Sequence, residues 1–330
     1  MTQFKALVTE QTDEGFRTTL KERSLDDLPA GDVVVRVHWS SLNYKDALSA
    51  TGNRGVTRQY PHTPGIDAAG EVVSASGGPW QPGDQVLVTG YDLGMNTDGG
   101  YGELIRVPAD WLIRIPQSLD ARTAMLYGTA GLTAALCVET LLDTGIEPEQ
   151  GQVLVTGASG GVGSLSVALL TQLGFEVVAG TGSADAADWL RQLGAVEIID
   201  RQSLAEGTAK PMLKPRWAGV VDSVGGDILF NAIKSLQYGG SAVCCGLAGS
   251  TELQGTVLPF ILRGVNLLGV DSVELPLEIK DQMWNLLATD WAIEQRDALL
   301  AAEVPLAELP DWFERILAGQ VRGRVLVKVS

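Results

Sequence analysis

The sequence predicts an α/β protein in which a doubly wound parallel sheet is joined to a β-rich, partly open barrel. Three observations support this. Short strand-like runs bounded by glycine and proline fill residues 1–122, apolar strands alternate with amphipathic helices from about residue 123, and a strand-like run ends the chain. Its 330 residues suffice for roughly two domains of ordinary size.

The first part of the chain is expected to be a barrel or sandwich of short strands. Branched and apolar runs lie between turn sequences such as Gly77-Gly78-Pro79 and Pro82-Gly83-Asp84. Frequent glycine and proline between short strands are typical of a partly open barrel. Strands are expected over residues 33–37, 71–73, 85–88, 104–107 and 111–115.

The second part alternates between strands and helices after a long helix expected over 123–143. Strands that are apolar throughout indicate a parallel sheet covered on both faces, and six of them fit a doubly wound fold. The strands are expected over 152–156, 176–180, 196–199, 219–223, 241–246 and 266–270. The helices are expected over 162–173, 184–193, 227–236 and 256–262.

The C-terminal part predicts that the first domain is discontinuous. One or two helices are expected around 277–287 and 309–318, and a strand over 324–329. A lone terminal strand needs a partner, which the first domain can supply. We therefore expect one domain made of 1–122 with 293–330, and a second made of 123–292.

Composition and charge exclude several classes of protein. Lys plus Arg is 24 and Asp plus Glu is 40, a formal net charge of −16, which argues against nucleic-acid and anionic-membrane partners. The first ten residues lack the apolar core of a signal peptide. The apolar stretch 123–138 is shorter than the roughly 20 residues that a membrane span needs. We expect a cytoplasmic protein.

Cysteine and histidine are scarce. Cys137, Cys244 and Cys245 cannot form a disulfide framework and are expected to be small buried side chains in a reducing compartment. With only His38 and His62, a histidine-rich catalytic metal site is not expected.

A glycine-rich turn lies between the strand 152–156 and the helix 162–173. Gly157 permits a tight turn, Gly160 and Gly161 let the backbone approach a pyrophosphate, and Gly163 allows the helix to pack closely on the strand. The free N–H groups of the helix N-terminus would face the phosphates. The alternative is a packing turn that binds no ligand. The predicted contacts here are Ser159, Gly160, Gly161, Val162 and Gly163.

The end of the second strand of this sheet selects the cofactor. A carboxylate there would bind the ribose diol of NADH, but the chain has Thr181-Gly182-Ser183, with no carboxylate until Asp185. Hydroxyl and backbone donors suit a 2′-phosphate, and Arg201 could add charge. We therefore predict NADPH as cofactor. The alternative is that Arg201 is an ordinary surface arginine.

Several motifs together resemble the medium-chain dehydrogenase/reductase superfamily across nearly the whole chain. Within it the sequence is most similar to the zinc-independent quinone-reductase-like group, and there to the acryloyl-CoA reductase branch. The resemblance implies a GroES-like first domain and a Rossmann second domain. The motifs lie at 38–48, 60–72, 153–163, 245–249, 259–263, 269–273 and 323–329.

The resemblance also implies chemistry without a metal. Zinc-dependent relatives have a cysteine where Ser41-Leu42-Asn43 stands and a histidine–glutamate pair where Gly65-Ile66-Asp67 stands. Reduction of an activated C=C bond remains possible without a Lewis acid. A hydride would add to the β-carbon, donors would stabilise the enolate oxygen, and the α-carbon would take a proton.

The resemblance assigns the candidate catalytic residues. Tyr44 is expected beside the nicotinamide, where it would orient cofactor or substrate and relay the proton, and Asn43 precedes it. The alternative is a half-buried tyrosine in a barrel wall. The next two residues, Lys45 and Asp46, are either part of this site or an exposed pair.

Further residues are assigned on the same ground. Arg324 is expected to contact a phosphate of NADPH or CoA, or else to be a plain charge on an edge strand, and Leu247 is expected at the cofactor. We expect His62 on a loop in a structural or exposed role, and Asp67 to bind local backbone donors. The branch usually has Ser-Gly-Arg where this chain has Thr181-Gly182-Ser183, which weakens the prediction of NADPH.

Three functions are compatible with the sequence. The first is reduction of acryloyl-CoA to propanoyl-CoA by NADPH, the second a broader NADPH:quinone or enone reductase, and the third a non-catalytic nucleotide-binding protein. A CoA substrate needs basic residues for its phosphates, and Arg54, Arg58 and Arg263 are candidates. The strand 266–270 is expected at the edge of its sheet, where pairing would give a homodimer.

Overall fold

The computed structural model describes residues 2–330, which form two compact units. The first comprises Met1–Thr129, Ser272–Asp290 and Leu300–Ser330, and the second Ala130–Asp271 and Trp291–Leu299. Residues 272–290 thus fall with the first unit, whereas the sequence placed them in the Rossmann range. The functional domain boundaries stay a prediction.

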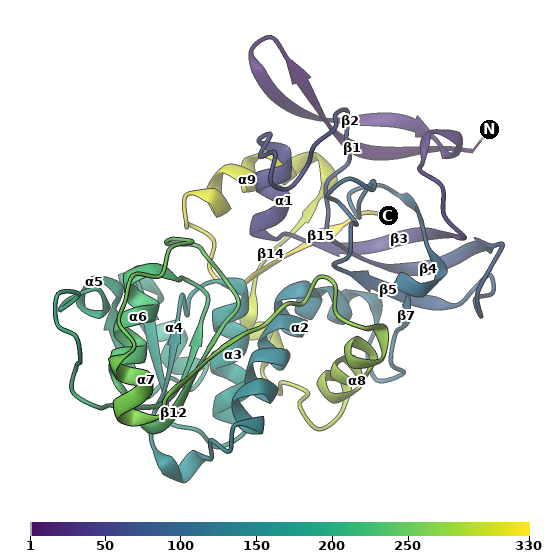
Figure 1. Cartoon of the computed structure of the whole chain (residues 1–330). Helices are drawn as coiled ribbons and strands as arrows, with labels where there is room; N and C mark the ends of the chain where they lie inside the picture. Colours follow the sequence, from purple (N-terminus) through teal and green to yellow (C-terminus); the bar gives the residue numbers. More distant parts are fainter. Residues whose placement is uncertain (1) are drawn as a thin grey trace. The chain divides into compact units, whose positions relative to one another are not determined.

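The second unit is built on a six-stranded parallel sheet of order β10-β9-β8-β11-β12-β13 (Figure 1). This confirms the predicted doubly wound sheet. The order reverses between β8 and β11, so the crevice at the carboxyl ends of these two strands is the expected place for a nucleotide. The strands are β8 (Val153–Thr156), β9 (Val177–Thr181), β10 (Glu197–Asp200), β11 (Trp217–Asp222), β12 (Leu236–Cys244) and β13 (Asn266–Gly269).

Helices connect these strands and bury both faces of the sheet. From β8 the chain adds β9 and β10 on one side of the sheet, and then β11, β12 and β13 on the other side. Because the crossovers between parallel strands are right-handed, the helices of the two halves lie on opposite faces of the sheet. One buried cluster joins Leu154 and Val220 of the sheet to Phe230 and Ile233. The helices are α3 (Gly161–Gln172), α4 (Ala187–Gln192), α5 (Arg201–Leu204), α6 (Gly226–Lys234) and α7 (Leu258–Arg263).

A long apolar helix, α2 (Ala121–Asp143), begins in the first unit and ends in the second. It is kinked at Gly128, where φ is +52° and ψ is −156°. Among the described residues it is the one helix long and apolar enough to cross a membrane, but 78% of its most apolar window is buried inside the protein. Core burial explains its composition.

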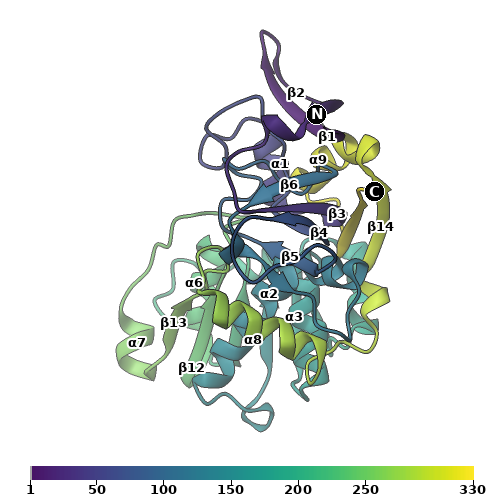
Figure 2. The same cartoon turned by 90° about the vertical axis from the view of Figure 1, so that its right-hand side faces the viewer.

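The first unit contains a seven-stranded sheet of order β14-β15-β3-β4-β5-β7, with β6 also paired to β3. Its strands β3, β4, β5 and β6 are labelled in Figure 2. The terminal strand pairs antiparallel with β3, with Leu326 opposite Ser41, so the prediction that it returns to the β-rich part is confirmed. The strands are β3 (Val33–Ser41), β4 (Asp67–Ala75), β5 (Gln85–Thr89), β6 (Leu104–Val107), β7 (Ile113–Arg114), β14 (Leu300–Pro305) and β15 (Arg324–Lys328).

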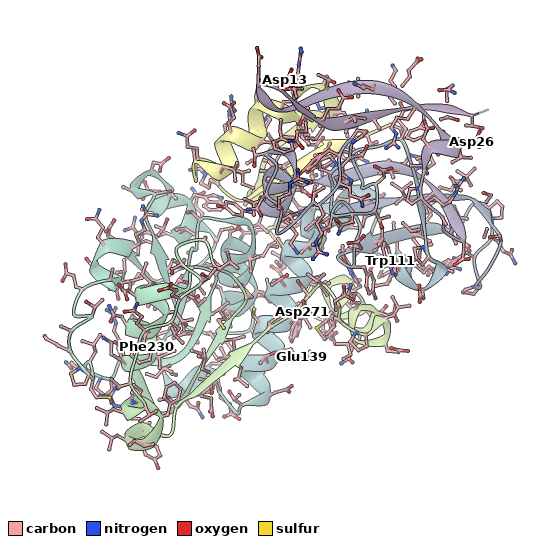
Figure 3. The ribbon with its side chains drawn as sticks, turned by 45° about the horizontal axis from the view of Figure 1, so that its top comes forward. Asp13, Asp26, Trp111, Glu139, Phe230 and Asp271 are labelled. Atoms are coloured by element: carbon pink, nitrogen blue, oxygen red, sulfur yellow. The ribbon has the colours of Figure 1, made fainter. Side chains whose placement is uncertain are left out.

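Three helices and a hairpin complete the first unit. The hairpin pairs β1 (Gln3–Thr12) with β2 (Gly15–Ser24), and Asp13 lies at its tip (Figure 3). Neither this hairpin nor the short helix α1 was predicted from the sequence as a separate element. The helices are α1 (Tyr44–Ala50), α8 (Leu277–Ala288) and α9 (Leu309–Leu317).

Candidate functional site

The glycine-rich turn of the second unit has the geometry of an anion cradle. At Gly163 a Cβ atom would lie 2.3 Å from the carbonyl oxygen of Gly157, so the turn closes only with glycine there. Gly157 itself has φ +60°. Helix α3 begins after Gly160 and has no side-chain cap. Its first N–H groups are therefore available to a phosphate, so this turn fits a dinucleotide cofactor.

Hydroxyl groups connect this turn to the end of β9. The Thr181 hydroxyl donates to Ser159 Oγ at 2.9 Å, and the backbone N–H of Ser183 donates to Thr181 Oγ1 at 3.1 Å. Thr181 is buried. The predicted residues Ser159, Thr181 and Ser183 are thus brought together around the turn.

Arg201 lies directly over Gly182. A Cβ atom at Gly182 would come within 2.8 Å of both Cδ and Nε of Arg201, so the two residues are in contact. Arg201 is exposed, and its neighbour Asp200 uses its carboxylate to cap α5 by accepting from Gln202 N. The structure therefore brings an exposed guanidinium to the end of β9, although the sequence has no arginine at position 183.

Asp222, at the end of β11, was not predicted as a functional residue. It accepts a hydrogen bond from the Thr156 hydroxyl at 2.5 Å and from the N–H groups of Val224 and Gly225 at 3.1 and 2.7 Å. Burial raises the pKa of this carboxyl. Asp222 therefore joins the carboxyl ends of β8 and β11 and shapes the loop at the reversal of strand order. The feature of the sequence that could have identified Asp222 is an aspartate at the end of an apolar strand.

Leu247 belongs to the loop that follows β12 and is 58% exposed. The backbone of this loop is fixed, because Ala248 N and Gly249 N donate to the carbonyl oxygens of Ser223 and Val224. An exposed apolar side chain on a fixed loop suits contact with a flat ring of a ligand.

In the first unit, Tyr44 is the first residue of α1 and is 42% exposed. It therefore lies on a helix and not in a strand of the barrel wall, as the alternative interpretation had it. Its neighbour Asn43 is buried. The Asn43 amide nitrogen donates to Asp67 Oδ2 at 2.9 Å and to Ser41 Oγ at 3.3 Å. Both amide hydrogens are thus occupied, and the geometry favours a positioning role for Asn43 over direct catalysis.

Asp67 is the centre of a buried polar network. Besides Asn43, it accepts from the Ser41 hydroxyl at 2.6 Å, from Thr129 N at 2.9 Å and from the Thr129 hydroxyl at 2.5 Å. The sequence predicted backbone donors for Asp67, but three of its four donors are side chains. These contacts hold the strand end at Ser41 against the kink of α2.

Arg324 lies in the same network and is 2% exposed. Its Nε donates to the carbonyl oxygen of Leu126 at 3.0 Å and its Nη2 to Ser41 Oγ at 2.9 Å, with longer contacts from Nη1 to Asn43 Oδ1 and Leu42 O. A guanidinium buried in this way has no exposed face for a phosphate, so its geometry supports a positioning role. It is also not a plain charge on an edge strand.

The kink at Gly128 makes room for this network. A Cβ atom there would lie 2.5 Å from Asp67 Oδ2, 2.8 Å from Ser41 Oγ and 2.9 Å from Arg324 Nη2. With φ at +52° as well, glycine is required at this position.

A second buried carboxyl, Asp46, lies beside the first. It accepts from Tyr101 Oη and Asn43 N, both at 2.8 Å, and from Ile66 N at 2.8 Å. The interpretation of Lys45 and Asp46 as an exposed pair is therefore wrong for Asp46. Burial, with the charge of Asp67 nearby, raises the pKa of Asp46 to about 7. When Asp46 is protonated, it can donate to Tyr101, whose hydroxyl then donates to Ser41 O at 3.1 Å.

The raised pKa of Asp46 makes stability depend on pH. Its folded pKa of about 7 lies above the ordinary 3.8, so its stabilising contribution is complete below pH 3.8 and is lost as pH rises through 7. We expect the free energy of unfolding to fall by up to about 1.4 kcal/mol per pH unit across that window, relative to Asp46→Asn. Urea unfolding of both proteins at several pH values measures this difference. The difference between the two proteins cancels the contribution of His62 to the pH dependence. Burial lowers the pKa of His62, so its contribution to stability changes with pH in the opposite direction. A difference that does not change with pH would contradict the assignment.

Other predicted residues have structural roles. His62 is buried rather than exposed, with Nδ1 3.8 Å from Asp98. Arg263 donates to the carbonyl oxygens of Lys234, Leu236 and Leu213. The three cysteines are free thiols; Cys137 is buried as predicted, whereas Cys244 and Cys245 are only partly buried.

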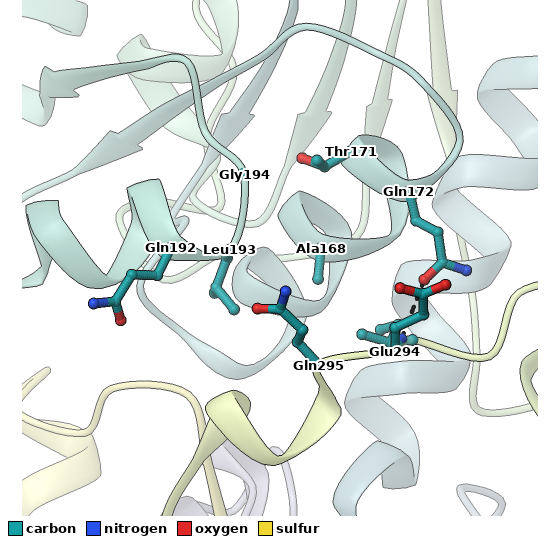
Figure 4. Close-up of a pocket in the computed structure, with 9 residues that line it drawn as sticks. Ala168, Thr171, Gln172, Gln192, Leu193, Gly194, Glu294 and Gln295 are labelled. Atoms are coloured by element: carbon teal, nitrogen blue, oxygen red, sulfur yellow. Dashed lines mark hydrogen bonds between the residues drawn. The ribbon is translucent and has the colours of Figure 1, made fainter.

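A hollow of about 290 Å³, lined by both polar and apolar residues, lies in the second unit away from the glycine-rich turn (Figure 4). Its lining includes Thr171 and Gln172 at the C-terminal end of α3. The N-terminal end of this twelve-residue helix, at the glycine-rich turn, is about 18 Å away. This hollow is therefore not the cofactor site.

Two family models match the chain. The alcohol dehydrogenase GroES-like domain matches residues 29–117, and the zinc-binding dehydrogenase model matches residues 161–289. A β-rich GroES-like domain followed by a domain of the dinucleotide-binding type defines a two-domain dehydrogenase or reductase.

Curated relatives extend over almost the full length. The chain is 47% identical to a probable acrylyl-CoA reductase of Escherichia coli, over 99% of this chain and 100% of the relative. It is 45% identical to a putative quinone oxidoreductase of Bacillus subtilis and to an acrylyl-CoA reductase of Ruegeria pomeroyi, each over 99% of both chains. The chain belongs to the medium-chain dehydrogenase/reductase family, in the group of acrylyl-CoA reductases and quinone oxidoreductases, and is an oxidoreductase.

Solved structures agree with the fold. The yhdH oxidoreductase from Salmonella enterica in complex with NADP superposes with a TM-score of 0.96 at 45% identity, covering all of both chains. The Bacillus subtilis protein yhfP with NAD bound also gives a TM-score of 0.96 at 45% identity, covering 99% of this chain and 100% of the other.

The residues of this chain do not fit the zinc site that one family description mentions. Ser41 and Asn43 donate to Asp67, and the Arg324 guanidinium lies in the same network, so the carboxylate has cationic and hydrogen-bond partners already. Within residues 2–330, no group of three or more His, Cys, Asp or Glu side chains could hold a metal ion.

Proposed function

We propose that the protein reduces the C=C bond of acryloyl-CoA to give propanoyl-CoA, with NADPH as cofactor and without a metal. The observation that carries the cofactor assignment is the exposed Arg201 side chain over Gly182, at the end of β9. The names of the Escherichia coli and Ruegeria pomeroyi relatives support the substrate.

The second unit would hold the cofactor. The N–H groups of Gly161, Val162 and Gly163 would bind the pyrophosphate, in keeping with the uncapped N-terminus of α3. Thr181, Gly182 and Ser183 would bind the 2′-phosphate together with Arg201, which replaces the arginine missing at position 183. Leu247 would cover a ring of the cofactor. NADPH, when bound, supplies the hydride that the β-carbon of the substrate accepts.

The first unit would complete the reaction. Hydride addition leaves an enolate, which needs a hydrogen-bond donor at oxygen and a proton at the α-carbon. Tyr44 is exposed and can relay this proton from solvent. Asn43, bonded to Asp67 and Ser41, fixes the start of α1 and with it the position of Tyr44.

A broader NADPH:quinone or enone reductase is the second candidate. The 45% identity to a putative quinone oxidoreductase of Bacillus subtilis supports this second function as strongly as the 45% identity to the Ruegeria pomeroyi reductase supports the first. The NAD bound to the yhfP structure makes NADH the alternative cofactor.

Steady-state assays separate these functions. The purified protein is given NADPH or NADH, with acryloyl-CoA or a simple quinone, and cofactor oxidation is followed. Turnover confined to NADPH and acryloyl-CoA supports the proposal. Quinone turnover without thioester turnover favours the second candidate. Tight NADPH binding without turnover of any activated alkene would indicate the non-catalytic protein.

Tyr44→Phe tests the proton relay. We expect kcat for acryloyl-CoA to fall about tenfold with little change in KM, because water can still protonate the enolate slowly. The solvent isotope effect on kcat should rise in the variant. Lys45→Gln, a change at the next residue of the same helix, is the control and should keep wild-type turnover. Full turnover by Tyr44→Phe would remove Tyr44 from the mechanism.

We also propose a cytoplasmic homodimer. The strand β13 lies at the edge of its sheet, and the exposed apolar side chains of Val257, Ile261 and Leu262 lie on and beside α7, just before it in the chain. Pairing of two β13 strands would cover their free backbone groups. Sedimentation analysis would detect the dimer, and Ile261→Asp should weaken it.

A further inference from the structure

The loop that follows α1 carries two exposed arginines, Arg54 and Arg58. The Arg54 guanidinium donates to the Arg58 carbonyl oxygen and, at 3.0 Å, to Gln11 Oε1. It also lies 5.6 Å from the centre of the Tyr60 ring. These contacts use two of the five N–H groups of the guanidinium, so the remaining donors can bind a ligand.

The loop is fixed by its own hydrogen bonds. The N–H groups of Val56 and Thr57 donate to the Asn53 carbonyl oxygen at 3.0 Å, and Thr57 Oγ1 lies 2.7 Å from Ser49 Oγ in α1. The Tyr60 hydroxyl donates to the Ser49 carbonyl oxygen at 2.7 Å. Two exposed cationic side chains on one fixed loop can bind an anion with little loss of backbone freedom.

Arg54 and Arg58 lie four residues apart on one loop, whereas two other exposed arginines of this unit, Arg17 and Arg36, lie on separate strands. The whole chain has a net charge of −16, so an anionic substrate is repelled unless cations lie at its binding site. Three further arginines of this unit are already used: Arg23 pairs with Asp98, Arg114 pairs with Asp84, and Arg106 binds the Leu25 and Leu28 carbonyl oxygens. Arg263, the third candidate from the sequence, is likewise occupied by carbonyl oxygens.

We propose that Arg54 and Arg58 bind the phosphate groups of the CoA part of the substrate, which rests on the proposed function. Helix α1 connects Tyr44 to this loop, and its seven residues span about 10 Å. The pantetheine arm separates the thioester of a CoA ester from its phosphates, so one ligand can run from Tyr44 to the loop. Guanidinium groups bind phosphate in bidentate fashion. The cation–π contact with the Tyr60 ring helps to fix the Arg54 side chain.

The test compares two thioesters that differ only in the nucleotide. Acryloyl-CoA carries the phosphates, and acryloyl-pantetheine does not. For the double variant Arg54→Gln/Arg58→Gln we expect KM for acryloyl-CoA to rise about tenfold per arginine removed, with kcat unchanged and with no effect on acryloyl-pantetheine. The control, Arg17→Gln/Arg36→Gln, removes two exposed charges elsewhere in the same unit and should leave both KM values unchanged.

Calorimetric titration with free CoA and with pantetheine gives a readout that does not need turnover. Weaker CoA binding by the double variant, with unchanged pantetheine binding, supports the phosphate site even if no thioester is reduced. Weaker CoA binding by the double variant, together with no reduction of either thioester, would overturn the proposed reaction but not the phosphate site. Turnover of both thioesters with equal KM by the wild type, or unchanged CoA affinity in the double variant, would overturn the arginine site and leave the reaction in place.

Discussion

Arg324→Met is expected to lower the free energy of unfolding by about 3–5 kcal/mol, because it removes one partner of a buried charged network. The guanidinium is 2% exposed and donates to the carbonyl oxygen of Leu126 and to Ser41 Oγ. Burial lowers the pKa of Arg324, and the nearby carboxyl groups of Asp67 and Asp46 act against this lowering. Without the guanidinium, the Asp67 carboxylate remains buried with no cation beside it.

Urea unfolding measures this loss, with two further variants for comparison. Arg36→Met replaces an exposed arginine in the same sheet and should change stability by less than about 0.5 kcal/mol. Arg324→Lys keeps the charge but loses the planar fork, so it should recover only part of the loss. Stability of Arg324→Met equal to that of Arg36→Met would show that the network does not depend on the guanidinium.

Local patterns in the sequence predicted most of the fold. The strongest signals for secondary structure are the apolar runs 152–156 and 219–223 and the helix 162–173. Each of these segments is apolar over enough residues to be buried on both sides. The structure has them as β8, β11 and α3 within a few residues. The β1–β2 hairpin was harder to predict, because β2 is mostly polar and has no buried residue, and the continuous buried run of β1, Ala6–Thr9, is short.

The site was predicted only in part, because its key contacts join residues far apart in the chain. The glycine-rich turn is local, and its spacing could be interpreted directly. By contrast, Arg324 meets Ser41 across 283 positions and Thr129 meets Asp67 across 62. No spacing rule links such residues. For the same reason the sequence could suggest Arg201 as a substitute for the missing arginine but could not show that it touches Gly182.

Arg201→Glu is expected to reverse the cofactor preference. The side chain that touches Gly182 would change from a cation to a carboxylate, which repels a 2′-phosphate and can instead bind the ribose diol of NADH. Loss of a charge-assisted pair and gain of a like-charge contact should together lower the ratio of kcat/KM for NADPH over NADH by at least about 100-fold. Steady-state assays with both cofactors at saturating substrate give this ratio.

A matched control separates the local effect from the change in net charge. Lys214→Glu makes the same change in charge at another exposed position of the second unit and should leave the ratio unaltered. Arg201→Lys keeps the charge without the fork and should fall between the wild type and Arg201→Glu. If Arg201→Glu kept the wild-type ratio, the hydroxyl and backbone donors of Thr181 and Ser183 would have to bind the 2′-phosphate alone, and Arg201 would be the ordinary surface arginine that the sequence left open.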